Sequence, residues 1–241
     1  MPIPATSARA VTACAVAALA LASCDRPEPP TKPAGASLFD AAFTPGDCAA
    51  VPAFAPPAVG TLFSSHLTSA GGVEEEMEVL STSGVSVSYS LVFVLKGGVR
   101  AKMSERAAHI GVLYDRVDSE PRRAFDYDSD PSIAYDLPQG GSRTFLVTER
   151  VTAEGHPTDV EHQFHVEMLG CGTLRWRGEN VPVKVLKADI ANASLDGAGA
   201  AESTARDVFT AYVAPQYGWP LLKIYADGSR EEVQRVDRPA T

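Results

Sequence analysis

The sequence is poor in the features that mark membrane-spanning and nucleic-acid-binding proteins. Its first apolar segment, Ala10 to Ala22, is thirteen residues long, and Thr12 is its only polar member. A span across the ~30 Å hydrocarbon core needs ~20 such residues, so this segment is too short to cross a bilayer. Thirty acidic side chains stand against twenty-one basic ones, and no block of lysine or arginine offsets them. Because such a surface repels phosphate backbones, the sequence predicts no nucleic-acid partner.

Motifs for common catalytic mechanisms are also lacking. No serine lies in a G-x-S-x-G turn. The segment from Gly197 to Glu202 begins like a phosphate-binding loop, but glutamate stands at its third glycine position and no helix is predicted after it. The sequence therefore predicts no catalytic residue, no metal, no cofactor and no enzyme. A triad assembled from distant residues stays open as an alternative.

What the sequence does contain is an export signal that ends in a cysteine. Arg9 precedes the apolar segment and small residues follow it, which are the parts of a cleavable signal. Leu21-Ala22-Ser23-Cys24 resembles the lipobox of bacterial lipoproteins, in which the chain is cut before a cysteine that carries diacylglycerol. The resemblance implies three acyl chains, such as palmitate, on Cys24. Two or more chains anchor stably, since each buried methylene contributes ~0.8 kcal/mol. An ordinary secretory signal, cut after Ala22 or Ser23, is the alternative.

The lipobox resemblance implies a location in the bacterial cell envelope, facing the periplasm and attached to the membrane through Cys24. Asp25 resembles a retention signal of enteric bacteria and favours the inner membrane, although the outer membrane stays open. We expect a signal peptide in 1–23, an acylated cysteine and proline-rich tether in 24–50, and a β-rich periplasmic domain in 51–241. Four prolines among the eleven residues from Asp25 to Gly35 predict an extended tether.

The cysteines beyond the signal form a single pair. Cys14 lies inside the signal peptide and Cys24 is the lipidation site, so Cys48 and Cys171 remain. An even pair in an oxidising compartment predicts a disulfide. Two buried thiols too far apart to bond are the alternative.

Beyond residue 60 the sequence alternates with period two. Val73, Glu75, Met77 and Val79 share one face of a predicted strand, and the other face carries Glu74, Glu76, Glu78 and Leu80. The segment 85–95 has an apolar face that includes Tyr89, Leu91 and Phe93. The Ser-Thr-Ser-Gly turn at 81–84 joins the two strands as a hairpin.

More strands are expected at short spacing, at 110–117, 123–128, 144–151, 159–168, 172–177, 181–191, 204–213, 219–226 and 230–236. Asp227-Gly228 between the last two favours a type I′ turn. Helix is expected only in short pieces, as one turn over Ser37–Phe43 and two turns over Lys102–Ile110. The predicted fold is mainly β, a single antiparallel and strongly curved sheet that forms a half-barrel, with a sandwich as the alternative.

Three histidines lie close together in the sequence, His156, His162 and His165, with acidic residues between them. Imidazole and carboxylate groups suit zinc or copper. On a strand, however, His162 shares a face with Val160 and Phe164, whereas His165 points to the opposite face. The spacing therefore argues against a shared metal ion. A periplasmic hydrolase that uses a histidine in 156–165 remains an alternative function.

Two acidic patterns invite a functional interpretation. Asp126-x-Asp128-x-Asp130 resembles the start of a calcium loop, but Pro131 and Leu137 stand where an EF-hand needs glycine and glutamate. A polar turn before Pro131 is the prediction. Glu74, Glu76 and Glu78 are expected to face water, and a docking surface for a basic partner is their alternative.

A late segment runs from Tyr212 through Pro215, Gly218 and Trp219 to Pro220. Its spacing of tyrosine, proline, glycine and proline resembles the ending of β-rich bacterial envelope proteins that have no assigned function. The residues predict a strand, a corner and a second strand, because Pro215 ends a ladder and Gly218 permits a sharp bend. The aromatic side chains are expected in the core.

These observations favour a non-catalytic binding or assembly role in the envelope, with an apolar ligand or a partner protein held against the curved sheet. A void lined by Tyr89, Leu91 or Phe93 would favour the ligand. A structural module that joins membrane to wall is a further alternative.

Overall fold

The structure is a computed structural model, and it describes residues 42–68, 72–95, 98–119, 121–195 and 201–239. The predicted signal peptide, the lipobox that ends at Cys24, Asp25 and the first part of the predicted tether lie outside these residues. So do residues 197–200 of the loop-like segment 197–202.

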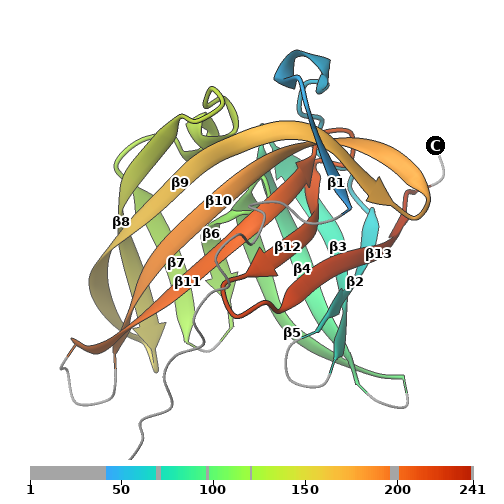
Figure 1. Ribbon diagram of the computed structural model, residues 1–241. Helices are drawn as coiled ribbons and strands as arrows, with labels where there is room; N and C mark the ends of the chain where they lie inside the picture. Colours follow the sequence, from blue (N-terminus) through green and yellow to red (C-terminus); the bar gives the residue numbers. More distant parts are fainter. Residues whose placement is uncertain (1–41, 69–71, 96–97, 120, 196–200, 240–241) are drawn as a thin grey trace, which may run out of the picture. The chain divides into compact units, whose positions relative to one another are not determined.

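Antiparallel strands make up nearly all of the described chain (Figure 1). They are β1 (Phe43–Gly46), β2 (Leu62–Leu67), β3 (Val73–Ser83), β4 (Ser86–Leu95), β5 (Val99–His109), β6 (Leu113–Asp118), β7 (Arg122–Tyr127), β8 (Ser142–Ala153), β9 (His156–Trp176), β10 (Glu179–Leu195), β11 (Ala201–Ala214), β12 (Trp219–Tyr225) and β13 (Arg230–Asp237). Within the part of the chain that the structure describes, helix occurs as two short 3₁₀ turns, η1 (Cys48–Ala50) and η3 (Pro131–Tyr135). Within the described ranges, none of the helical segments has the length and apolar character needed to cross a bilayer.

All thirteen strands belong to one sheet, in the order β1-β9-β10-β11-β12-β13-β2-β3-β4-β5-β6-β7-β8, and β8 pairs again with β9. The pairing of β8 with β9 closes strands β2 to β13 into a ring, and β1 is added to it along the edge of β9. Figure 1 shows β9 and β10 arching over the shorter strands. The prediction of a mainly β, antiparallel and strongly curved sheet is confirmed, and the curvature continues until the sheet closes.

Strand β9 organises the ring because it is twenty-one residues long and has three partners. Its first half pairs with β8 and its second half pairs with β1, while β10 follows its other edge. A disulfide joins Cys48, directly after β1, to Cys171 in β9, with their Cα atoms 4.9 Å apart. This is the pairing that the sequence predicts. At Gly172 any side chain would collide with the Thr44 carbonyl oxygen, so the close approach of β1 needs glycine.

Buried side chains form two clusters on opposite faces of β10 and β11. Val181, Val183 and Val185 belong to the first cluster, whereas Leu186, Ala188 and Ile190 belong to the second. Consecutive residues of a strand point to opposite faces, so the buried face of β10 switches between Val185 and Leu186. The register passes over Leu169 of β9 at the same place, which is a β-bulge. Residues 211–214 of β11 are buried on both faces, because they contribute alternately to the first and the second cluster.

The late proline-glycine segment forms the predicted strand, corner and strand. β11 ends at Ala214, a turn follows over 215–218, and β12 starts at Trp219. Trp219 is buried in the first cluster, edge-on to Tyr89 with ring centroids 5.1 Å apart. The buried tip of the β5–β6 hairpin packs against this corner, since a side chain at Gly111 would overlap Trp219 and Pro220.

Several sequence expectations need correction. Lys102–Ile110 lies largely in strand β5 and is not helical. The segments 159–168 and 172–177 are one strand, β9, because the bulge at Leu169 interrupts the alternation without ending the ladder. Residues 43–50 were assigned to the tether and to a helical turn that ends at Phe43. They form β1 and η1 instead, held by the disulfide and by the buried Phe43 ring. Strand β2 was not predicted.

The turn between β12 and β13 also differs from the prediction. A type I′ turn needs positive φ at both central residues, and Asp227 does not have it. The loop spans 226–229, with Gly228 at φ +85° and the Asp227 carboxylate accepting a hydrogen bond from the Ser229 amide at 2.8 Å. Positive φ at both residues occurs instead at Glu154-Gly155 and Arg177-Gly178, in the hairpins on either side of β9.

We predict that replacing both bridging cysteines, as Cys48→Ala with Cys171→Ala, lowers the free energy of unfolding by about 4 kcal/mol. The bridge closes a loop with a sequence separation of 123 residues, and removing it restores chain entropy to the unfolded state. Urea unfolding followed by circular dichroism measures the difference. Reduced wild-type protein should match the double variant, and equal stability of all three samples would show that the bridge contributes nothing.

Candidate functional site

A buried ion pair connects β12 and β13. Lys223 and Glu231 lie directly opposite each other in the register, so their side chains share one face. Lys223 is 7% exposed, and its Nζ donates to Glu231 Oε2 at 3.1 Å, where the Tyr225 hydroxyl also donates at 3.1 Å. Burial acts to lower the pKa of Lys223, but the Glu231 carboxylate outweighs it and the pKa is raised. Lys223 is therefore a fixed positive charge committed to Glu231.

Glu75 of β3 is a carboxyl group in an apolar row. It follows the alternation of Met77 and Val79, both of which are buried. No hydrogen bond or ion pair to its carboxyl group occurs within the described part of the chain. Burial, followed by the negative charge of Glu231, raises the pKa of Glu75 to about 7. Glu75 therefore changes charge near neutral pH.

Arg106 of β5 supplies a positive charge to the same region. Its Nε donates to Ser104 Oγ at 2.9 Å, its guanidinium lies 5.9 Å from the centre of the Tyr114 ring, and it is also hydrogen-bonded to the Tyr114 side chain. Glu75 attracts it electrostatically, but among the described residues Arg106 forms no ion pair with a carboxylate. The guanidinium is half-buried, and with five N–H donors it can still bind a further partner.

These groups line one cavity of about 100 Å³, which we call the charged cavity. Its wall is formed by β2–β6 on one side and by β12 and β13 on the other, beside the first core cluster. The lining residues are Phe63, Ser65, Leu67, Glu75, Met77, Tyr89, Leu91, Arg106, Tyr114, Trp219, Lys223, Tyr225, Glu231 and Val233. Two charges, on Glu75 and Arg106, thus face a shared space without pairing with each other. The cavity can accept a small polar or charged group beside an apolar surface.

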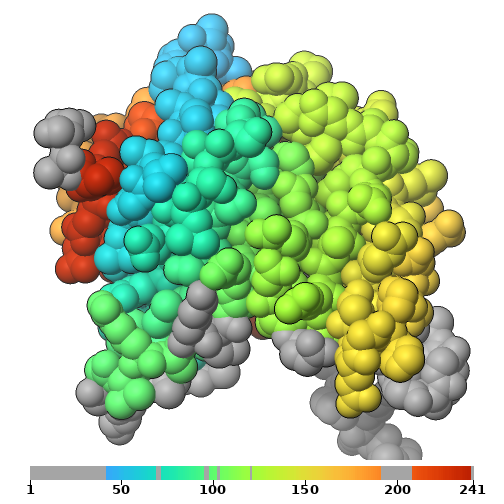
Figure 2. All heavy atoms as spheres, turned by 180° about the vertical axis from the view of Figure 1, so that it is seen from behind, coloured from blue at the N-terminus to red at the C-terminus, as the bar shows by residue number. Residues whose placement is uncertain are grey.

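The opposite face of the same wall carries the predicted row of glutamates. Glu74 and Glu78 are exposed, and Glu76 forms an ion pair with Arg100 at 2.8 Å. Figure 2 shows the face on which β2, β3 and β4 lie side by side, in cyan and green. A groove of about 320 Å³ lies over Glu74 and Glu76, next to the residues Ser64, His66, Val94, Gln234 and Arg235. The prediction that these glutamates face water holds for Glu74 and Glu78, whereas the Glu76 side chain, paired with Arg100, is only 17% exposed.

The clustered histidines separate as their spacing predicts. His162 is 4% exposed and points into the second cluster, where its Nε2 lies 2.6 Å from Glu149 Oε2. Arg123 reaches the other oxygen of the 3% exposed Glu149 at 3.4 Å. His165 contacts Thr144 Oγ1 at 2.9 Å, and His156 is exposed. His162 and Glu149 line neither cavity described above.

No group of three or more potential metal ligands occurs within the described residues. The Asp126–Asp130 pattern forms the polar turn that the sequence predicts, since the Asp130 carboxylate accepts a hydrogen bond from the Ser132 amide at 2.9 Å and starts η3.

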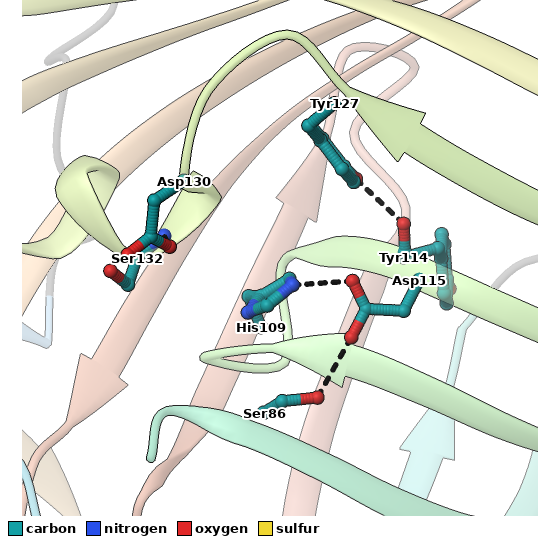
Figure 3. A network of polar contacts seen from close by, with 7 residues as sticks. All are labelled: Ser86, His109, Tyr114, Asp115, Tyr127, Asp130 and Ser132. Atoms are coloured by element: carbon teal, nitrogen blue, oxygen red, sulfur yellow. Dashed lines mark hydrogen bonds and ion pairs between the residues drawn. The ribbon is translucent and has the colours of Figure 1, made fainter. Parts of the chain in front are cut away.

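A second polar network joins β4, β5 and β6 (Figure 3). Ser86 donates to Asp115 Oδ2 at 2.7 Å, and the His109 Nε2 contacts the other oxygen of that carboxylate. The β5–β6 register passes over Asp115, and a bulge of this kind re-aims a side chain. The aspartate lies between serine and histidine, which is not the order of a nucleophilic triad. The network fixes Asp115 and does not activate Ser86.

Two of the site residues stand out in the sequence in a way that the motifs above do not capture. Glu75 stands among Val73, Met77 and Val79, and Lys223 stands between Leu221 and Tyr225, each as a lone charge in an apolar row. Arg106 gave no such signal, because its segment was assigned to helix. Tyr89 and Leu91 do line a cavity, as one functional hypothesis required, but that cavity is also lined by charged residues.

Comparisons with known proteins are limited to distant structural likenesses. No protein-family model matches the sequence, and no curated protein matches it. Among solved structures, the hypothetical lipoprotein YmcC from Escherichia coli K12 is 12% identical, with a TM-score of 0.42 over 76% of this chain and 86% of that one. A protein from Bacteroides fragilis, inferred to be exported and to have a YmcC-like fold, is 10% identical, with a TM-score of 0.46 over 77% and 99%. A protein inferred to be a lipoprotein, from Parabacteroides distasonis, is 10% identical, with a TM-score of 0.44 over 78% and 99%.

We predict that Glu75 makes the fold less stable as the pH rises from about 4.5 to about 7. The folded state holds the Glu75 proton up to about pH 7, whereas the unfolded chain releases it near 4.5. Because the folded state binds more protons in this window, stability falls as the pH rises, by up to about 3 kcal/mol. Glu75→Gln should remove this part of the pH dependence in urea unfolding measured at pH 5 and pH 8.

The matched control is Glu74→Gln, one residue away on the opposite face. This variant should keep the wild-type difference between pH 5 and pH 8. If Glu75→Gln and Glu74→Gln behave alike, the Glu75 carboxyl group titrates as it does in water and the burial argument is wrong.

Proposed function

We propose that the chain is a lipid-anchored protein of the bacterial envelope that works by binding a ligand rather than by catalysis. The charged cavity is its binding site. The observation that carries this proposal is that Glu75, an acid held near its neutral form, and Arg106, a cation with no ion pair among the described residues, face one space beside buried apolar side chains. Unpaired buried charge destabilises a fold, and a ligand that pairs with it offsets that cost.

The size of the cavity supports a small ligand. Sites for drug-sized molecules typically measure ~300–1,000 Å³, and the charged cavity measures about 100 Å³. The space suits a small molecule, or the end of a larger one, better than the acyl chain that a purely apolar lining would accept. A broad apolar docking face has less support, because the exposed large apolar residues lie on separate segments: Val59, Leu80, Val99, Ile133 and Leu146.

The envelope location rests on the sequence and on the disulfide. Leu21-Ala22-Ser23-Cys24 supplies the anchor, and a disulfide between Cys48 and Cys171 suits an oxidising compartment such as the periplasm. The bridge would fix the first strand of the β unit close to the point where the tether enters it. The tether would then present the charged cavity to the periplasm while the acyl chains stay in the membrane.

We predict that Cys24→Ser releases the protein from membranes, because a hydroxyl group at this position cannot carry the thioether-linked diacylglycerol. Mass spectrometry should show the loss of the acyl mass, and fractionation should move the protein to the soluble fraction. Cys14→Ser is the control, since its cysteine lies in the signal segment and should leave lipidation intact. A Cys24→Ser protein that stays in membranes with unchanged mass would contradict the anchor.

We predict further that the membrane-extracted protein carries a small molecule in the charged cavity. Native mass spectrometry should detect its added mass in the wild type. Leu67→Trp places a large ring in the cavity wall and should abolish the added mass, whereas Leu146→Trp, at an exposed position 56% accessible on β8, should keep it. An added mass that survives Leu67→Trp, or none in any sample, would contradict binding in this cavity.

A further inference from the structure

The two cations that line the charged cavity differ in their partners. Lys223 and Tyr225 both donate to Glu231, so the charge of Lys223 is already paired with a carboxylate. Arg106 is the lining cation that has no carboxylate ion pair among the described residues, and its planar guanidinium matches the two oxygens of a carboxylate. A single available cation points to a ligand with a single negative charge.

The acidic residues of the cavity argue against a doubly charged anion such as phosphate. Glu231 forms an ion pair with Lys223, and Glu75 stands on the same lining. A dianion in the cavity would be repelled by the Glu231 carboxylate, and the single guanidinium of Arg106 would balance only one of its two negative charges. A carboxylate needs only Arg106, provided that Glu75 is neutral and can donate its own proton to the ligand.

The apolar part of the lining limits the rest of the ligand. Leu67, Met77 and Leu91 border the same space as the charges. With liquid water occupying ~30 Å³ per molecule, about 100 Å³ corresponds to a group of only a few heavy atoms. A carboxylate on a short hydrocarbon segment fits both the volume and the mixed lining.

We propose that the charged cavity binds a small monocarboxylate, with its carboxylate on the Arg106 guanidinium and Glu75 facing it as a neutral acid. This inference rests on the proposed function and names the chemical class of the ligand. The charged and titratable groups that line the charged cavity together with Glu75 are Tyr89 of β4, Arg106 of β5, Tyr114 of β6, Lys223 and Tyr225 of β12, and Glu231 of β13. An anion beside these groups raises the proton affinity of Glu75, so binding takes up protons and weakens as the pH rises through about 7.

The test compares three probes of one shape, butyrate, butyramide and butylamine, by saturation-transfer NMR and by calorimetric titration of the full chain at pH 7. Butyrate should bind most tightly. Arg106→Met should lower the affinity for butyrate by at least about tenfold. Arg106→Lys should lower this affinity by an intermediate factor, because lysine keeps the charge but not the paired donors. Arg116→Met, at an exposed arginine of neighbouring β6, should leave the affinity unchanged.

Proton uptake provides the second measurement. Titrations in buffers of different ionisation enthalpy at pH 7.5 should show uptake of part of one proton with butyrate. The Glu75→Gln variant should still bind butyrate, since glutamine keeps a hydrogen-bond donor. It should take up no proton when it binds. Unchanged butyrate affinity in Arg106→Met, or uptake that persists in Glu75→Gln, would overturn the assignment.

The probes separate this inference from the proposed function. If butyramide or butylamine binds more tightly than butyrate and loses binding in Leu67→Trp, the cavity is a binding site but the carboxylate class is wrong. If none of the three binds to the wild type, the cavity fails as a site for small ligands, and both proposals fall.

Discussion

The pairing of β8 with β9 holds the fold together, and it is possible because β9 is long enough to serve two neighbours on one edge. Twelve residue pairs join it to β8, from Ser142–Glu167 to Ala153–His156, and β1 continues along the same edge from Cys171 to Leu174. An open sheet of this size would expose unpaired N–H and C=O groups on its outer strands, which promote aggregation. Closure removes those edges, and the disulfide at Cys171 ties the added strand β1 to the ring. The position of every other side chain depends on this closed register.

Closure also explains why the fold has two core clusters and a charged cavity. A long strand cannot curve around one compact core without an irregularity, and the bulge at Leu169 moves the buried face of β10 from one side to the other. The first cluster then lies between β2–β5 and β10–β13, where Phe63, Tyr89 and Trp219 pack together. Beyond these rings the same strands continue in register, and their inward positions carry Glu75, Arg106 and Lys223. The charged cavity is therefore built on paired strands and is not a loop feature.

Much of this architecture can be predicted from the alternation of apolar and polar residues along the sequence. The segments that were predicted wrongly share one physical cause. The β3–β4 hairpin, the outward row of glutamates and the opposed directions of His162 and His165 follow from the two-residue period of a strand. The corner at Pro215–Gly218 follows from the backbone properties of proline and glycine. The period fails wherever a bulge inserts a residue. In β5 the register with β4 passes over Met103, so Lys102–Ile110 loses its alternation and resembles a helix. Sheet closure itself rests on pairing between distant segments, which no local pattern encodes.

The site residues show where pattern analysis could have gone further. A lone charge in an apolar row is an expensive residue, because burying an ionised carboxyl or ammonium group needs a partner to offset its desolvation. For Lys223 the partner is set by the β12–β13 register of the structure, in which Glu231 falls opposite it. The two-residue turn expected at Asp227-Gly228 would have placed Glu232 there instead. For Glu75 no partner exists in the described structure, and its register neighbours are Ser65 and Phe93. The ion pair of Lys223 and Glu231 satisfies both of its charges within the fold. Glu75 is an acid held near its neutral form without a hydrogen bond or ion pair in the described structure, and such a group marks a position where a ligand can supply the missing partner.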